Sequence, residues 1–174
     1  MASRFAFIRG IKIHPSFHLV SADNELYDNI WRYADEHGVI LLSHTWDISL
    51  TNPVQKYSYP TRFEKFVKRY PGVRFILAHS GGRYNGILEA ARIAKENRNV
   101  FLDIAGDIYA NEFLEYITGE VGSQRILFGT DYPMMDQHTM LGVVLGAGIS
   151  LKDKENILFN NAYDLFCLNG RCPL

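Results

Sequence analysis

Cysteine is scarce in this sequence. Only Cys167 and Cys172 occur among 174 residues, and both lie near the carboxyl terminus. Two thiols cannot build a disulfide framework, and no neighbouring Cys or His gives the pair the spacing of a zinc finger. We expect two reduced cysteines; closure of a small loop in an oxidising compartment is the alternative.

An excess of charge and a long apolar run are also absent. The 18 basic and 19 acidic residues give a net charge of -1, which offers no reason to expect nucleic acid or a membrane surface as a partner. No apolar run is long enough to span a bilayer, and the first ten residues lack the apolar core and cleavage site of a signal peptide. We therefore expect a single cytoplasmic domain over residues 1–174.

Short apolar segments alternate with segments of helical periodicity along the whole chain. Continuous apolar runs of this length are typical of strands covered on both faces. The expected strands cover residues 7–13, 39–44, 73–79, 100–104 and 125–129. The expected helices cover residues 23–37, 60–70, 87–97 and 111–117, with further helix up to residue 168.

The first of these helices has recognisable ends. Asp23 can cap its first turn, and Gly38 can end its last turn. The apolar stripe expected to face the sheet consists of Leu26, Ile30, Tyr33 and Ala34.

Five strands that alternate with helices predict an α/β fold with a parallel sheet and right-handed crossovers. A flavodoxin-like doubly wound sheet and part of a (β/α)₈ barrel both fit this order. A complete barrel usually needs at least ~200 residues, and the chain is shorter than that.

Three of the expected strands end in, or lead into, a side chain that can bind a metal. His44 and His79 end their strands, and Asp131 follows the last strand. The carboxyl ends of parallel strands open on one face, so these side chains can meet there. Imidazole nitrogen and carboxylate oxygen are good ligands for a divalent metal, which would make bound water a nucleophile near neutral pH. Taken singly, each histidine also fits a hydrogen-bonded loop residue, and Asp131 fits a turn before Pro133.

Four strand-end motifs and the tail resemble the amidohydrolase-related (amidohydrolase 2) family of metal-dependent hydrolases and decarboxylases. The motifs are GIKIHP at residues 10–15, LSH at 42–44, ILAHSGG at 76–82 and LFGTDYP at 127–133. The tail NILFNNAYDLF at residues 156–166 is similar to the family's closing helix. The resemblance covers nearly the whole chain, in the expected order.

The resemblance implies a partial TIM-like (β/α) barrel, in which the five strands correspond to strands 4–8 of a (β/α)₈ barrel. His44 then matches the metal ligand after the fifth strand. His79 matches the histidine after the sixth, which orients or activates water or binds a second metal. Asp131 matches the aspartate after the eighth strand, a ligand and proton acceptor together. The implied cofactor is a divalent metal, zinc in the first place, with manganese or iron as alternatives.

Three further residues are candidates for binding the substrate. Lys12 and His14 belong to the fourth-strand motif, and Arg83, in the turn after His79, can anchor a carboxylate. The aromatic loop at residues 46–59 fits either a substrate wall or packing on the rim. Asp103 and Asp107 fit either the pocket or the surface.

The sequence departs from the family pattern in one respect. The family has a His-x-His pair after its first strand, and no such pair occurs here. His44, His79 and Asp131 then carry the metal site without that pair, and counterparts of strands one to three are not found.

The first functional hypothesis is a metal-dependent hydrolase that attacks a C–N or ester bond of a small, carboxylate-bearing molecule. Asp131 would act as the base, and His79 would polarise the substrate. The alternatives are non-oxidative decarboxylation at the same site, or a non-catalytic, shortened barrel that pairs with another chain. Two exposed sheet edges would favour such pairing, including self-association.

Overall fold

The computed structural model describes residues 9–166, and their centre is one parallel sheet of five strands. The strands lie side by side in the order of the sequence, and each pairs in parallel with the next. They are β1 (Gly10–Ile13), β2 (Ile40–His44), β3 (Phe75–Ala78), β4 (Val100–Asp103) and β5 (Ile126–Leu127).

One longer helix connects each strand to the next, and a group of short helices follows β5. The four crossover helices are α2 (Asp28–His37), α3 (Glu64–Arg69), α4 (Tyr84–Glu96) and α5 (Phe113–Val121). The α-helices after β5 are α6 (Gln137–Gly146), α7 (Leu151–Glu155) and α8 (Asn161–Leu165), and a π-helical turn, η7 (Asn156–Asn160), joins α7 to α8. The short helix α1 (Pro15–His18) follows β1, and the 3-10 turns are η2 (Glu25–Tyr27), η3 (Pro53–Tyr57), η4 (Pro60–Phe63), η5 (His79–Gly81) and η6 (Ser123–Arg125).

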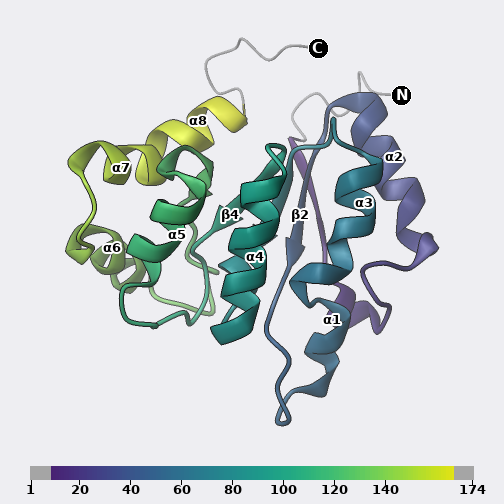
Figure 1. Cartoon of the computed structure of the whole chain (residues 1–174), viewed down its shortest axis with the longest axis horizontal. Helices are drawn as coiled ribbons and strands as arrows, with labels where there is room; N and C mark the ends of the chain where they lie inside the picture. Colours follow the sequence, from purple (N-terminus) through teal and green to yellow (C-terminus); the bar gives the residue numbers. More distant parts are fainter. Residues whose placement is uncertain (1–8, 167–174) are drawn as a thin grey trace.

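All four crossover helices cover the same face of the sheet (Figure 1). Leu41, Leu77 and Leu102 point from the strands into the large apolar core that these helices share. A doubly wound sheet has helices on both faces and reverses its strand order, so the structure excludes the flavodoxin-like alternative. Sequential order with helices on one face is the arrangement of a barrel wall.

The opposite face of the sheet has a smaller core. Ile40, Ile76 and Leu127 alternate along the strands with the residues of the large core, and Leu165 of α8 packs against them. Side chains of successive residues point to opposite faces of a strand, which explains the division. Helix α8 therefore covers part of the face that would line the interior of a closed barrel.

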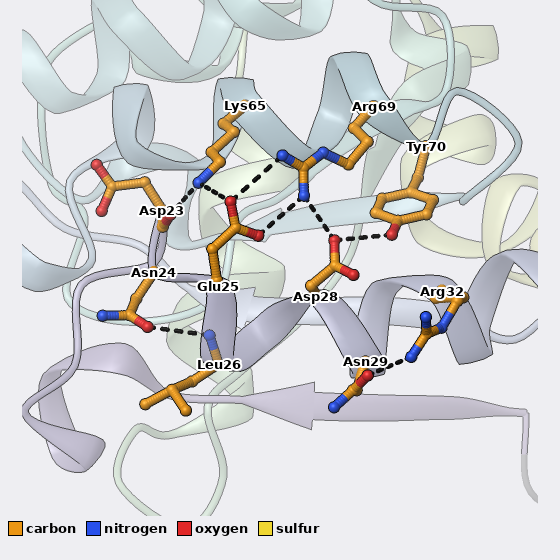
Figure 2. A network of polar contacts seen from close by, with 10 residues as sticks. All are labelled: Asp23, Asn24, Glu25, Leu26, Asp28, Asn29, Arg32, Lys65, Arg69 and Tyr70. Carbon is orange, nitrogen blue, oxygen red and sulfur yellow. Dashed lines mark hydrogen bonds and ion pairs between the residues drawn. The ribbon is translucent and has the colours of Figure 1, made fainter.

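Helix α2 ends where expected, and two residues of the expected stripe, Ile30 and Ala34, face the core. Gly38 adopts the left-handed conformation with a φ of 63° and ends the helix. Asn24, not Asp23, caps the 3-10 turn η2 that precedes α2, and its side chain accepts a hydrogen bond from the amide of Leu26 (Figure 2). The buried residues of this segment are Tyr27, Trp31 and Ala34, whereas Leu26 is 72% exposed and Tyr33 45% exposed.

The change of stripe follows from the first turn. The segment begins with the 3-10 turn η2, which has 3.0 residues per turn instead of 3.6. Residues within such a turn are rotated relative to one continuous α-helix, so Leu26 leaves the expected stripe and Tyr27 is buried instead.

All five strands are shorter than expected within the described residues, β3 and β5 most clearly. The strand expected over residues 125–129 contains only Ile126 and Leu127, because the amide of Phe128 donates to the carbonyl of Ile157 instead of continuing the sheet. The strand expected over residues 73–79 ends at Ala78, so His79 begins the following turn. Residues 7 and 8 of the first expected strand, Cys167 and Cys172 lie outside the described residues. Within residues 9–166, no helix has the length and apolar character needed to cross a membrane.

Candidate active site

The candidate site lies where the strands end, at the lower edge of the sheet toward which the arrow of β2 points (Figure 1). The pairing of His44 with Ala78 places the ends of β2 and β3 side by side, and His79 follows immediately. His79 and Ser80 both have positive φ angles, 62° and 45°. This sharp turn keeps the imidazole of His79 at the end of the sheet instead of continuing the strand away from it.

Three imidazoles gather at this edge. The rings of His14 and His44 are stacked, with centroids 4.1 Å apart and planes 9° apart. The ring of His79 meets that of His44 edge to face, at 4.9 Å and 65°. The structure thus brings together one predicted substrate residue, His14, and two predicted metal ligands.

Burial lowers the pKa of two of these histidines. For His44 the pKa falls to about 3, mainly because the ring is desolvated and then because of the neighbouring His79. For His14 it falls to about 4, again through burial first and then through the charge of Lys12. Both rings are therefore neutral at pH 7, and the neutral ring is the form of histidine that binds metal ions.

Asp103, at the end of β4, supports His79. One oxygen of its buried carboxylate accepts hydrogen bonds from the backbone amides of His79, at 2.8 Å, and Ala105, at 3.0 Å. The Nδ1 atom of His79 lies 2.8 Å from the carbonyl oxygen of Ala105. Complete burial raises the pKa of the Asp103 carboxyl. Asp103 thus holds the backbone of the turn that carries His79.

The residue that the sequence did not indicate is Gln55. Its side-chain oxygen lies 2.8 Å from Nε2 of His44, and the residue belongs to η3 in the loop after β2. A glutamine within an aperiodic loop has no sequence pattern that would distinguish it.

A cavity of about 590 Å³ opens beside His44. The loop after β2 forms one side, including Trp46, and the turn after β3 forms the other. The guanidinium of Arg83 lies 5.8 Å from the centre of the Trp46 ring and forms an ion pair with Asp107. The expected loop wall, Arg83 and Asp107 therefore all line one cavity. The lining residues are His44, Trp46, Asp47, Ile48, Ser49, Thr51, Asn52, Gln55, Arg83, Tyr84 and Asp107.

Lys12 lies near this group, since its charge lowers the pKa of His14 and of His44, whereas Asp131 lies in another loop. Lys12 is exposed on β1, paired with Leu42. Asp131 is half-buried in the loop after β5, with a φ of 60°. No hydrogen bond or ion pair among the described residues joins its carboxylate to His44 or His79, so its role as ligand and base stays a prediction.

The other histidines are engaged elsewhere. Nδ1 of His18 lies 2.7 Å from the hydroxyl of Tyr27, His37 contacts the carbonyl of Tyr33, and His138 contacts Asp136.

The described residues fit a metal ion only in part. His44 and His79 offer two imidazoles at the ends of adjacent strands, but no three His, Cys, Asp or Glu side chains within residues 9–166 are grouped as a metal site. Catalytic zinc typically has three protein ligands. The described part of the chain is therefore at least one ligand short of a catalytic centre.

Solved structures share this fold. A TIM-barrel protein from Bordetella bronchiseptica is 19% identical, with a TM-score of 0.74 over 87% of this chain and 54% of its own. Amidohydrolase 2 from Bifidobacterium longum subsp. infantis is 16% identical, with a TM-score of 0.65 over 84% and 56%. A dihydroxybenzoic acid decarboxylase from Polaromonas, solved with bound manganese and an inhibitor, is 20% identical, with a TM-score of 0.64 over 86% and 56%.

The chain spans about half the length of these structures, and the similarity confirms the partial barrel. No curated protein matches the sequence. The model of the Amidohydrolase (Amidohydro_2) family matches residues 4–168, nearly the whole chain. The chain therefore belongs to the amidohydrolase family.

Proposed function

We propose that this chain forms the carboxyl-terminal part of a metal-dependent hydrolase, which cleaves a C–N or ester bond of a small, carboxylate-bearing molecule. The observation that supports the proposal is the pair of imidazoles, His44 and His79, in contact at the ends of adjacent strands and beside a cavity. Family membership adds the expectation of metal-dependent chemistry.

The ion needs ligands that residues 9–166 do not bring together. We propose Asp131, in the loop after β5, as a further ligand. We therefore assign no reaction step to the ion and limit the mechanism to what the side chains of this chain can do.

His79 is assigned the role of an acceptor. Its Nδ1 lies against the carbonyl of Ala105, so Nδ1 donates the hydrogen bond and Nε2 keeps its lone pair. A lone pair can bind an ion or accept a proton, but it cannot polarise a substrate carbonyl. The geometry therefore favours a ligand or a base over the polarising role that the sequence suggested.

Arg83 is assigned to the carboxylate of the substrate. Its guanidinium faces the cavity and lies over Trp46, and a carboxylate can form two parallel hydrogen bonds with it. The guanidinium of Arg83 forms an ion pair with Asp107 in the structure. A substrate carboxylate would have to displace Asp107 from it.

Metal content tests the proposal. Elemental mass spectrometry on the purified protein should find about one zinc, manganese or iron per chain, and less in His44→Ala and Asp131→Ala. His37→Ala is the matched control, since His37 lies at the end of α2 and contacts only the carbonyl of Tyr33 among the described hydrogen bonds. If wild-type protein binds no metal after incubation with each ion, the metal-dependent function is wrong and the chain is a non-catalytic barrel portion.

Decarboxylation is the second candidate, and the composition of the cavity favours it. An indole wall with a guanidinium beside it suits a flat, anionic aromatic acid. A panel of aromatic acids, assayed for released carbon dioxide, separates this activity from hydrolysis of amides and esters. Loss of turnover in His44→Ala would assign either activity to the same site.

A further inference from the structure

A buried chain of hydrogen bonds leads away from His44. Nε2 of His44 lies 2.8 Å from Oε1 of Gln55, which also lies 3.0 Å from the hydroxyl of Ser16. That hydroxyl is 2.7 Å from the hydroxyl of Ser58. Gln55, Ser16 and Ser58 are 8%, 3% and 0% exposed, so water does not compete freely for these contacts.

A backbone amide favours one direction for these hydrogen bonds. The amide of Ser16 donates to the hydroxyl oxygen of Ser58 at 3.0 Å. The Ser58 hydroxyl then donates to the hydroxyl oxygen of Ser16, whose own proton points to Gln55. The Gln55 atom that receives it must be the carbonyl oxygen, and an oxygen cannot donate to His44.

The reversed orientation of the amide is less satisfactory. If Gln55 presented its NH₂ group to Ser16 and His44, the Ser16 hydroxyl would turn toward Ser58. The proton of Ser58 would then have no acceptor among the hydrogen bonds of residues 9–166. Buried hydroxyl groups without a partner are costly, so the first orientation is favoured.

We propose that Gln55, oriented by Ser16 and Ser58, is a positioning residue that fixes neutral His44 as the tautomer with its proton on Nε2. The Nδ1 atom then carries the lone pair. The significance of this tautomer for catalysis rests on the proposed function, but the tautomer itself does not depend on a bound metal.

The two histidines then use opposite nitrogens. His79 donates from Nδ1 to the carbonyl of Ala105 and keeps its lone pair on Nε2. His44 donates from Nε2 and keeps its lone pair on Nδ1. A second hydrogen bond that fixes the tautomer and orientation of a ring is a common requirement for histidine ligands.

Nitrogen NMR of the imidazole rings tests this directly. Protein labelled with ¹⁵N-histidine, treated with a chelator and measured at pH 7.5, gives distinct signals for protonated and bare ring nitrogens. The spectrum of His44→Gln identifies the His44 signals. We expect a protonated Nε2 and a bare Nδ1 in wild-type protein.

Three variants test the positioning role. Gln55→Met removes the acceptor at similar length, and should raise the population with the proton on Nδ1 by about fivefold, the equivalent of one ordinary hydrogen bond. Gln55→Glu retains only acceptor atoms and should keep a proton on Nε2. Ser16→Ala removes the group that orients the amide and should give a smaller shift than Gln55→Met. Thr118→Val is its matched control, since the hydroxyl of Thr118, in α5, is buried without a hydrogen-bond partner among the described residues.

A proton on Nδ1 in wild-type protein would overturn the proposal. So would an unchanged tautomer ratio in both Gln55→Met and Ser16→Ala, with their backbone spectra showing that the fold is retained. If the tautomer is as expected but the protein binds no metal, the positioning role stands and the proposed hydrolase function fails.

Discussion

Trp31 is the largest side chain that the helical face of the sheet encloses completely. Its ring packs against Phe66 and Phe75, with centroids 5.7 Å and 4.7 Å away. The indole nitrogen has no hydrogen-bond partner among the described residues. Trp31 therefore contributes through apolar packing, and it anchors α2 to both α3 and β3.

Truncation of this side chain should be severe. Trp31→Ala is expected to lower the free energy of unfolding by about 3–5 kcal/mol, because the cavity left behind is too large to collapse. Urea denaturation followed by circular dichroism measures the effect. Leu26→Ala is the control, since Leu26 is 72% exposed and should stay within about 0.5 kcal/mol of wild type. A larger loss of stability in Leu26→Ala than in Trp31→Ala would instead support the apolar stripe expected from the sequence.

Replacing Gly38 is costly because of its backbone conformation alone. Its φ is 63°, and a Cβ built there would meet nothing within 4 Å. Gly38→Ala should therefore lower the free energy of unfolding by about 1 kcal/mol through backbone strain, without a steric clash. Gly119→Ala, inside α5 and also without nearby atoms, should stabilise instead, since alanine favours helix by about 1 kcal/mol. Equal effects at the two positions would contradict this explanation.

At the scale of elements, a polar network fastens the start of α2 to α3. Arg69 of α3 donates to the carboxylates of Glu25 and Asp28, and the hydroxyl of Tyr70 donates to Asp28 at 2.8 Å (Figure 2). Hydrogen bonds from Arg69 first, and then from Lys65, lower the pKa of Glu25 from 4.5 to about 2. The network therefore contributes stability only while the carboxylates are ionised.

The pH dependence follows from the sign of this shift. Because the pKa of Glu25 is lower in the folded state, its stabilisation is complete above pH 4.5 and disappears as the pH falls toward 2. Arg69→Ala should have a lower melting temperature than wild type at pH 7, and the two should converge below pH 4.5. Thermal melts across this range provide the test. Arg32→Ala is the control, since Arg32 donates to the neutral side chain of Asn29, and its difference from wild type should not follow the same titration.

The elements differ in how well the sequence predicted them. The strands were recognisable because β2 and β3 are continuous apolar runs, and their carboxyl ends correctly located His44 and His79. The buried stripe of α2 was right for Ala34 and Ile30 but wrong for Tyr33 and for Leu26, which lies in the 3-10 turn η2. The contact between His44 and Gln55 was not predictable, since it depends on how an irregular loop returns to the sheet.

At the scale of the molecule, the sheet is open and has two edge strands, β1 and β5. Among the described residues, β1 pairs only with β2, and β5 pairs only with β4. The face opposite the crossover helices is covered in part by α8. Unpaired backbone groups and apolar side chains at such edges favour contact with another chain.

Reversible self-association is the expected consequence. Sedimentation equilibrium of the purified chain should give a mass that rises with concentration above the 19.9 kDa of one chain. Lys12→Pro should reduce the effect, because a proline in the edge strand β1 has no amide hydrogen to offer a neighbour. A constant monomeric mass over the whole concentration range would exclude association through the edges.

The placement of the two tryptophans gives the protein an internal fluorophore for its own site. Trp46 lies 5.5 Å from the ring of His79 and 5.9 Å from that of His44, whereas Trp31 is sealed in the apolar core. In a Trp31→Phe background all indole emission would arise beside the candidate ligands. Paramagnetic manganese bound there would quench that emission and diamagnetic zinc would not, so a titration would report manganese occupancy directly and zinc occupancy by protection against that quenching.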